Sequence, residues 1–182
     1  MSETSITSKS ELMTPSGARR LFRYNEHLFD RYERRIRKIP WEEASRSRDI
    51  GHLSLFQTLV HILEVHEVWI GHIVQGRNSD PELQKLFEDP ARKPRDWRGF
   101  SKYRRRVWST VNGYLESLKP EDMPRRVSAP WMPGRYSVSD ALMQTTFEQA
   151  HHLGEIIGAL WQQDIEPPGM TWIDIGRRLM EN

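Results

Sequence analysis

One long stretch near the carboxyl end of the chain, residues 137–163, constrains the fold most. Its inward-facing residues recur at steps of three and four, which is the repeat of one face of an α-helix: Leu142, Thr146, Gln149, Leu153, Ile156 and Leu160. Ser137 and Asp140 have the spacing of a capping box, in which a hydroxyl and an acid satisfy free N–H groups of the first turn. The stretch is therefore predicted to be one helix that buries a face against other helices.

Four ionisable side chains lie close together within this predicted helix: Glu148, His151, His152 and Glu155. With about 100° of rotation per residue, Glu148 and His152 lie one turn apart on the same side, whereas His151 points away from the apolar face. His152 is therefore predicted to face inward, with His151 as the alternative. A glutamate and a histidine at this spacing can bind one metal ion when another helix supplies a third ligand.

A second hydrophobic stretch, residues 53–75, contains the candidate for that third ligand. His61 lies in it between apolar neighbours, and a histidine in such a run is either a hydrogen-bonded core residue or a ligand. Glu64 follows one turn later, where its carboxylate either orients the imidazole of His61 or faces the solvent. His66 and His72 are interpreted as surface or core-edge residues, and His72 lies too far along the helix to share an ion with His61.

The rest of the sequence predicts an all-α protein. Further helices are expected over residues 15–39, 81–88, 98–118 and 172–180. Prolines and a glycine between residues 124 and 136 predict a loop or a small two-stranded turn. Four long helices and a short terminal one indicate a four-helix bundle, whose long second connection permits an order other than up-and-down. Asn25 interrupts an apolar face and is expected to join two helices by hydrogen bonds.

Length indicates one domain over residues 14–182, preceded by a weakly ordered polar tail over residues 1–13. Lys and Arg number 27 and Asp and Glu 25, so the net charge is only +2. The basic clusters at residues 34–38 and 104–106 are therefore interpreted as solvated helix faces, and nucleic-acid binding is not expected. Neither a secretory leader nor an apolar run of membrane-spanning length is evident, so a cytoplasmic location is expected.

The sequence contains no cysteine. This absence excludes disulfides, thiolate nucleophiles and thiolate metal ligands at the same time. Any metal ion must therefore be bound by histidine, carboxylate and water.

Three segments, taken together, resemble the DinB/YfiT-like superfamily of four-helix-bundle metalloproteins: LFRYNEHLFDRYERRI, HLSLFQTLVHILEVHEVWIGHIVQG and RYSVSDALMQTTFEQAHHLGEI. The resemblance extends over about residues 17–163 and implies a metal ion between the second and last long helices, usually bound by three histidines. Carried over by position, the ligands are His61, Glu148 and His152, with glutamate where the family more often has histidine. A set of two histidines and one carboxylate suits Zn, Ni, Fe or Mn.

The resemblance also implies a function. Members with assigned activities include thiol-dependent transferases and isomerases, so we expect a metal-dependent transferase or hydrolase that acts on a small-molecule substrate. A low-molecular-weight thiol is the candidate cosubstrate. Glu155 and Glu64 are candidates for a proton acceptor or for support of the ligands, and a homodimer is expected from the resemblance alone.

Two other interpretations remain open. The departure at Glu148 is compatible with a non-catalytic helical bundle that serves as an interaction module, with or without a metal ion. Glu148 and His151 also form an E-x-x-H pair of the di-iron type. That site requires a second such pair on a facing helix, and the sequence has none.

Overall fold

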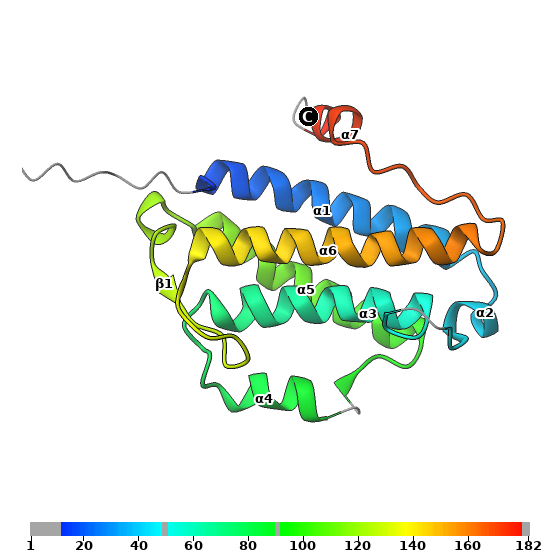
Figure 1. Cartoon of the computed structure of the whole chain (residues 1–182), viewed down its shortest axis with the longest axis horizontal. Coiled ribbons are helices and arrows are strands. Elements are labelled where there is room, and N and C mark those ends of the chain that lie inside the picture. The colour runs from blue at the N-terminus through cyan, green and yellow to red at the C-terminus, as the bar shows by residue number, and fades with distance from the viewer. Residues whose placement is uncertain (1–11, 49–50, 90–91, 180–182) are drawn as a thin grey trace, which may run out of the picture.

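The computed structural model describes residues 12–48, 51–89 and 92–179. Within these ranges four long helices form a bundle (Figure 1): α1 (Pro15–Ile36), α3 (Leu55–His66) with its π-helical continuation η1 (Glu67–Ile73), α5 (Trp97–Ser117) and α6 (Val138–Trp161). The shorter elements are α2 (Trp41–Ser45), α4 (Pro81–Glu88), the 3-10 turn η3 (Pro120–Asp122), β1 (Arg126–Val127), β2 (Tyr136–Ser137) and α7 (Trp172–Arg178). The predicted all-α four-helix bundle is confirmed. Most of the predicted tail, residues 1–11, lies outside the described residues.

The long helices do not alternate in direction. α1 and α6 run one way, and α3 and α5 run the other way (Figure 1). The segment with α4 carries the chain back along the bundle, so that α5 starts beside the start of α3. Ring contacts agree with this register: Phe56 packs on Trp97 with 5.0 Å between ring centroids, and His66 packs on Trp108 with 4.8 Å.

Capping residues in the sequence set several helix ends. Thr14 and Ser54 each accept a hydrogen bond from a first-turn N–H, at the starts of α1 and α3. The predicted capping box of α6 is confirmed, because Asp140 N donates to Ser137 Oγ at 3.0 Å and Ser137 N donates to Asp140 Oδ2 at 2.9 Å. The box fixes where α6 begins, and so fixes the height of His152 in the bundle.

The helix α1 ends earlier than predicted, at Ile36 and not at Ile39. The N–H of Lys38 bonds to Arg35 O and that of Ile39 to Ile36 O, so the last turn tightens into three-residue steps. The connection that follows contains the short helix α2.

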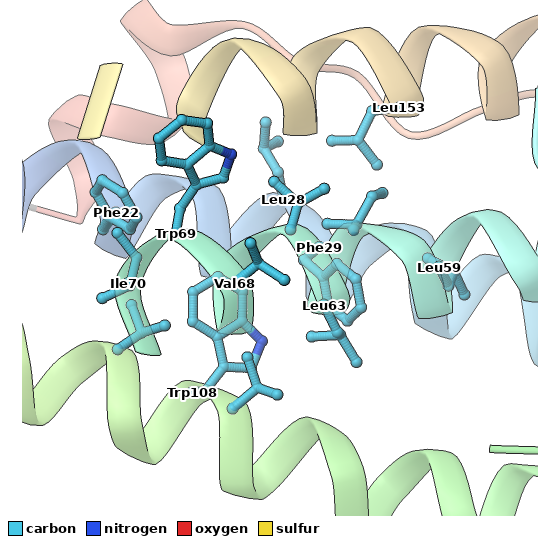
Figure 2. Packing of buried hydrophobic residues seen from close by; sticks show 14 of the residues in the cluster. Phe22, Leu28, Phe29, Leu59, Leu63, Val68, Trp69, Ile70, Trp108 and Leu153 are labelled. Carbon is cyan, nitrogen blue, oxygen red and sulfur yellow. The ribbon is translucent and has the colours of Figure 1, made fainter. Parts of the chain in front are cut away.

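The hydrophobic core fills the space between the four long helices (Figure 2). Phe29 of α1 is fully buried, and its ring lies 6.1 Å from the rings of both Phe100 and Trp108 on α5. Asn25 is buried as well. Its side-chain amide donates to Thr146 Oγ1 at 3.3 Å, and its backbone carbonyl accepts from Gln149 Nε2 at 2.7 Å, which confirms that this residue joins α1 to α6 by hydrogen bonds.

The backbone after α6 returns along α1. Three arginine or tyrosine side chains of α1 donate to its carbonyl oxygens: Tyr32 to Pro168 at 2.7 Å, Arg31 to Gly169 at 2.8 Å and Arg35 to Glu166 at 3.0 Å. Part of the basic surface of α1 therefore anchors the C-terminal segment.

A small hairpin precedes α6. β1 and β2 pair antiparallel, with Arg126 opposite Ser137, and the connecting loop contains Gly134 at φ +98°, which a glycine adopts without strain. The predicted two-stranded turn is confirmed. Trp131 in this loop packs on Trp69 of η1 and Phe87 near the end of α4, with ring centroids 5.7 and 5.5 Å apart.

The second long helix, α3 with η1, changes its hydrogen bonding at Glu67. Val74 N donates to Trp69 O and Arg77 N donates to His72 O, both at 2.9 Å and both across five residues. A π-helical turn holds more residues than an α turn, so side chains beyond Glu67 point to other faces than α spacing predicts. His72 is consequently buried, with 7 % of its surface exposed.

No helix in the described ranges has the length and apolar character that a membrane span requires.

Candidate metal centre

Three histidines from three segments meet between α3 and α6. His61 lies on α3, His152 lies on α6, and His52 lies in the turn that leads into α3. The ring centroids are 3.5 Å apart for His52 and His61, 4.5 Å for His61 and His152, and 4.9 Å for His52 and His152. One nitrogen of each ring lies within 4.8 Å of the others. One cation between the three rings is therefore within reach of all of them.

His152 faces inward, as its helical position predicted, and only 5 % of it is exposed. Its Nδ1 lies 2.9 Å from Glu155 Oε2, so we assign the proton to Nδ1, which donates to the carboxylate. In the neutral ring Nε2 then carries the lone pair. This atom is buried without a hydrogen-bond partner. An imidazole held by a carboxylate at one nitrogen, with the other nitrogen free, is the usual state of a metal-binding histidine.

His61 has a carboxylate beside it too. Its Nδ1 lies 3.5 Å from Glu64 Oε2, and Glu64 also pairs with Lys93 at 2.9 Å. Burial by itself raises the pKa of Glu64, but its contacts with His61 and Lys93 outweigh burial and hold the pKa below its ordinary value. Glu64 is therefore an ionised carboxylate that holds the ring of His61.

His52 is held as a neutral imidazole. Burial, followed by the nearby rings of His61 and His152, lowers the pKa of His52 to about 4. A neutral ring offers a lone pair at neutral pH, which is the form that a metal ion binds.

The turn that carries His52 is closely fitted to α6. A Cβ atom on Gly51 would lie 2.3 Å from Glu155 Oε1, so glycine allows the turn to approach the carboxylate that holds His152. Leu53 has φ +68°, a conformation that costs a non-glycine residue about 1–2 kcal/mol. The turn keeps this strained residue between His52 and the cap residue Ser54, whose N–H donates to His52 O at 2.8 Å.

Glu148, predicted as a ligand, lies next to the three histidines without joining them. Its Oε2 is 3.5 Å from His152 Nε2, and its Oε1 accepts a hydrogen bond from Gln144 at 2.7 Å. Within the described ranges, Glu148 belongs to neither group of converging ligand atoms. The role of Glu148 as a ligand stays a prediction. In the group of three histidines, His52 is the third candidate ligand.

The second group of converging atoms consists of His151, His152 and Glu155. His151 Nε2 lies 3.5 Å from Glu155 Oε1, and the His151 side chain is 66 % exposed. In this group the carboxylate already bonds to His152 Nδ1, whereas the group with His52 contains no carboxylate and leaves that hydrogen bond intact. We therefore take the three histidines as the better candidate.

Sequence reasoning missed His52. Helical periodicity carries no information about the direction of a side chain in a turn, and His52 lies in the turn before α3. The available signal was weak: His52 opens the segment that resembles the second helix of the family, two residues before the cap of α3.

An open cavity of about 580 Å³ lies beside the site. His52, His61 and Glu64 line it, together with Trp41 and Arg95 among others. A group bound between the histidines is therefore accessible to a small molecule.

A four-helix bundle with histidines converging between its second and last long helices defines a class of helical proteins with a candidate metal site inside the bundle. A family model described as the DinB superfamily matches residues 24–156, and the chain belongs to this superfamily. The search of curated proteins gives no match.

Proposed function

We propose that this protein is a metal-dependent enzyme that holds one divalent cation between His52, His61 and His152. The observation that carries the proposal is the convergence of two other imidazole rings on the ring of His152, whose buried Nε2 has no hydrogen-bond partner. A set of three imidazoles favours Zn²⁺, Ni²⁺ or Fe²⁺ over Mn²⁺, because manganese prefers oxygen ligands.

The surrounding side chains have separate tasks in this proposal. Glu155 and Glu64 are predicted from the sequence as proton acceptors or as supports of the ligands. Both contact imidazoles, and we assign them the second task, the orientation of His152 and His61. Glu148 keeps one carboxylate oxygen 3.5 Å from His152 Nε2, and we assign it the task of accepting a proton released in the site.

The reaction proposed is the activation of a small nucleophile. A bound divalent ion lowers the pKa of a water molecule or a thiol and so supplies the nucleophile at neutral pH. The cavity beside His52 and His61 admits the second reactant. Transfer to or from a low-molecular-weight thiol and hydrolysis by water both fit this chemistry.

Elemental analysis of protein purified without an affinity tag tests the proposal. We expect about one equivalent of metal per chain, retained by the His151→Ala variant and lost by the His52→Ala variant. Loss of the metal in the His151→Ala variant and its retention in the His52→Ala variant would instead support the group that contains His151. A wild-type protein that takes up no stoichiometric metal, even from solutions of Zn²⁺, Ni²⁺ and Fe²⁺, would support the non-catalytic interaction module.

Thiol binding then separates the two reactions. Titration of the metal-loaded protein with glutathione, cysteine and other small thiols is followed by the absorbance of a Co²⁺-substituted site. If the protein binds metal but thiols do not change the absorbance of the Co²⁺-substituted site, hydrolysis remains as the proposed reaction.

A further inference from the structure

The cavity beside the histidines has an aromatic part in its lining. Trp41 of α2 and Phe56 of α3 line it, and their rings pack edge to face with centroids 5.0 Å apart. Trp41 is 36 % exposed, so its ring is available to a molecule in the cavity. Flat apolar groups pack well on such rings.

The lining also has a positive part, in the segment before α5. It contains Lys93 and Arg95. Lys93 pairs with Glu64 at 2.9 Å, so its charge is compensated. Arg95 is exposed and makes no hydrogen bond or ion pair with any residue that the structure describes. Arg95 therefore leaves one uncompensated positive charge at the edge of the cavity.

We propose that this cavity binds a small organic acid, whose carboxylate pairs with Arg95 and whose flat apolar part packs on Trp41 and Phe56. Its other end then lies toward His52 and His61. A guanidinium presents two parallel N–H groups that match a carboxylate, and the volume of about 580 Å³ suits a ligand of this size. The inference names the substrate class of the proposed function and rests on it for the reaction.

The sign of the charge excludes the opposite class of substrate. Arg95 and a divalent cation between the histidines both repel a cationic molecule. Among the described residues that line the cavity, Glu64 is the one carboxylate, and it is occupied by Lys93 and His61. A neutral molecule would leave Arg95 unpaired but would not be repelled, so the experiment must compare an acid with its neutral analogue.

Isothermal titration calorimetry on the full chain, as purified and after addition of one equivalent of Zn²⁺, makes this comparison. The probes are phenylacetate, its neutral analogue phenylacetamide, and acetate, which lacks the apolar part. We expect phenylacetate to bind about tenfold more tightly than either of the other two. Arg95→Gln should weaken phenylacetate binding about tenfold, whereas Arg98→Gln, the matched control on an exposed arginine that does not line the cavity, should leave it unchanged. Trp41→Leu should weaken phenylacetate binding without affecting acetate.

Equal affinity for phenylacetate and phenylacetamide would overturn the inference. So would phenylacetate binding that requires Zn²⁺ and is insensitive to Arg95→Gln, because the carboxylate would then bind the metal; the proposed metal site would stand in that case. If Zn²⁺ does not bind and the dependence on Arg95 is nevertheless found, the metal proposal fails and the anion site stands. Circular dichroism of each variant confirms that it is folded.

Discussion

Helix α3 carries two histidines, His61 and His66, in two different environments. His61 points toward α6 and the cavity, and its side chain is 27 % exposed. His66 is fully buried and packs between Phe22 of α1 and Trp108 of α5, with ring centroids 5.9 and 4.8 Å away. The same residue type on one helix thus faces a candidate metal site on one side and the core on the other.

His66 and His152 also share one property, a buried ring nitrogen without a hydrogen-bond partner. His66 Nδ1 donates to Ile62 O at 2.8 Å, and its Nε2 is buried without a partner, like Nε2 of His152. Among the described residues, however, no group of converging ligand atoms includes His66. Convergence of further ligands, and not the lack of a hydrogen bond, is therefore what distinguishes the candidate metal centre from the core.

Alanine substitutions at the two positions test this distinction most strongly. His61→Ala should weaken Zn²⁺ binding by more than about a hundredfold, since loss of a ligand exceeds the roughly 10–100-fold effect of losing a supporting partner. His66→Ala should leave Zn²⁺ affinity unchanged but lower the free energy of unfolding by about 3 kcal/mol, because it opens a cavity in the core.

Zinc titration and urea unfolding measure the two effects. His151→Ala, on an exposed side chain, should change neither quantity and serves as the control. Weakened Zn²⁺ binding in the His66 variant would contradict the separation of the two sites.

Acid pH should lower the stability that the core region around His66 contributes. Burial lowers the pKa of His66 from 6.5 to about 4, the opposing effect of its hydrogen bond to Ile62 being smaller. As the pH falls, the unfolded chain takes up this proton first, so stability present above pH 6.5 is lost toward pH 4. The contribution of His66 to unfolding free energy should thus be about 2 kcal/mol smaller at pH 5 than at pH 7.

The metal-free wild type and the His66→Met variant, compared by urea unfolding at each pH, isolate this contribution. Other buried histidines affect both proteins equally. The variant should lose less stability on acidification than the wild type, and equal losses would show that His66 is protonated in the fold.

A substitution at the contact between the turn and α6 should have the smallest effect. Gly51→Ala places a Cβ against the carboxylate of Glu155, which must then move from His152 Nδ1. Loss of this support should weaken Zn²⁺ binding about tenfold. Gly154→Ala on α6, where an added Cβ meets nothing within 4 Å, should not weaken it. Equal zinc affinities of the two variants would mean that the turn does not govern Glu155.

The sequence predicted those parts of the site that lie on regular helices. The capping box fixed the start of α6, and α-helical spacing correctly turned His152 inward and placed Glu64 beside His61. Periodicity could not predict His52, because the direction of its side chain depends on the turn around Leu53 with its positive φ.

Periodicity also failed where a helix is covered on more than one side. α3 packs against α6 and α5, so His66 is buried although it lies away from the face that carries His61. Hydrophobic spacing identifies one buried face of a helix, but it does not predict a second face that is buried against a parallel helix.

The wide turn of η1 separates the second long helix into two parts that can change independently. A turn of this kind corresponds to one residue more than a continuous α-helix would hold. Losing that residue would rotate everything downstream, including the side chains that meet α5, by about 100°. The upstream part that carries His61 would keep its orientation. We therefore expect relatives of this chain to tolerate changes of length within residues 67–73 while the imidazoles upstream remain aligned.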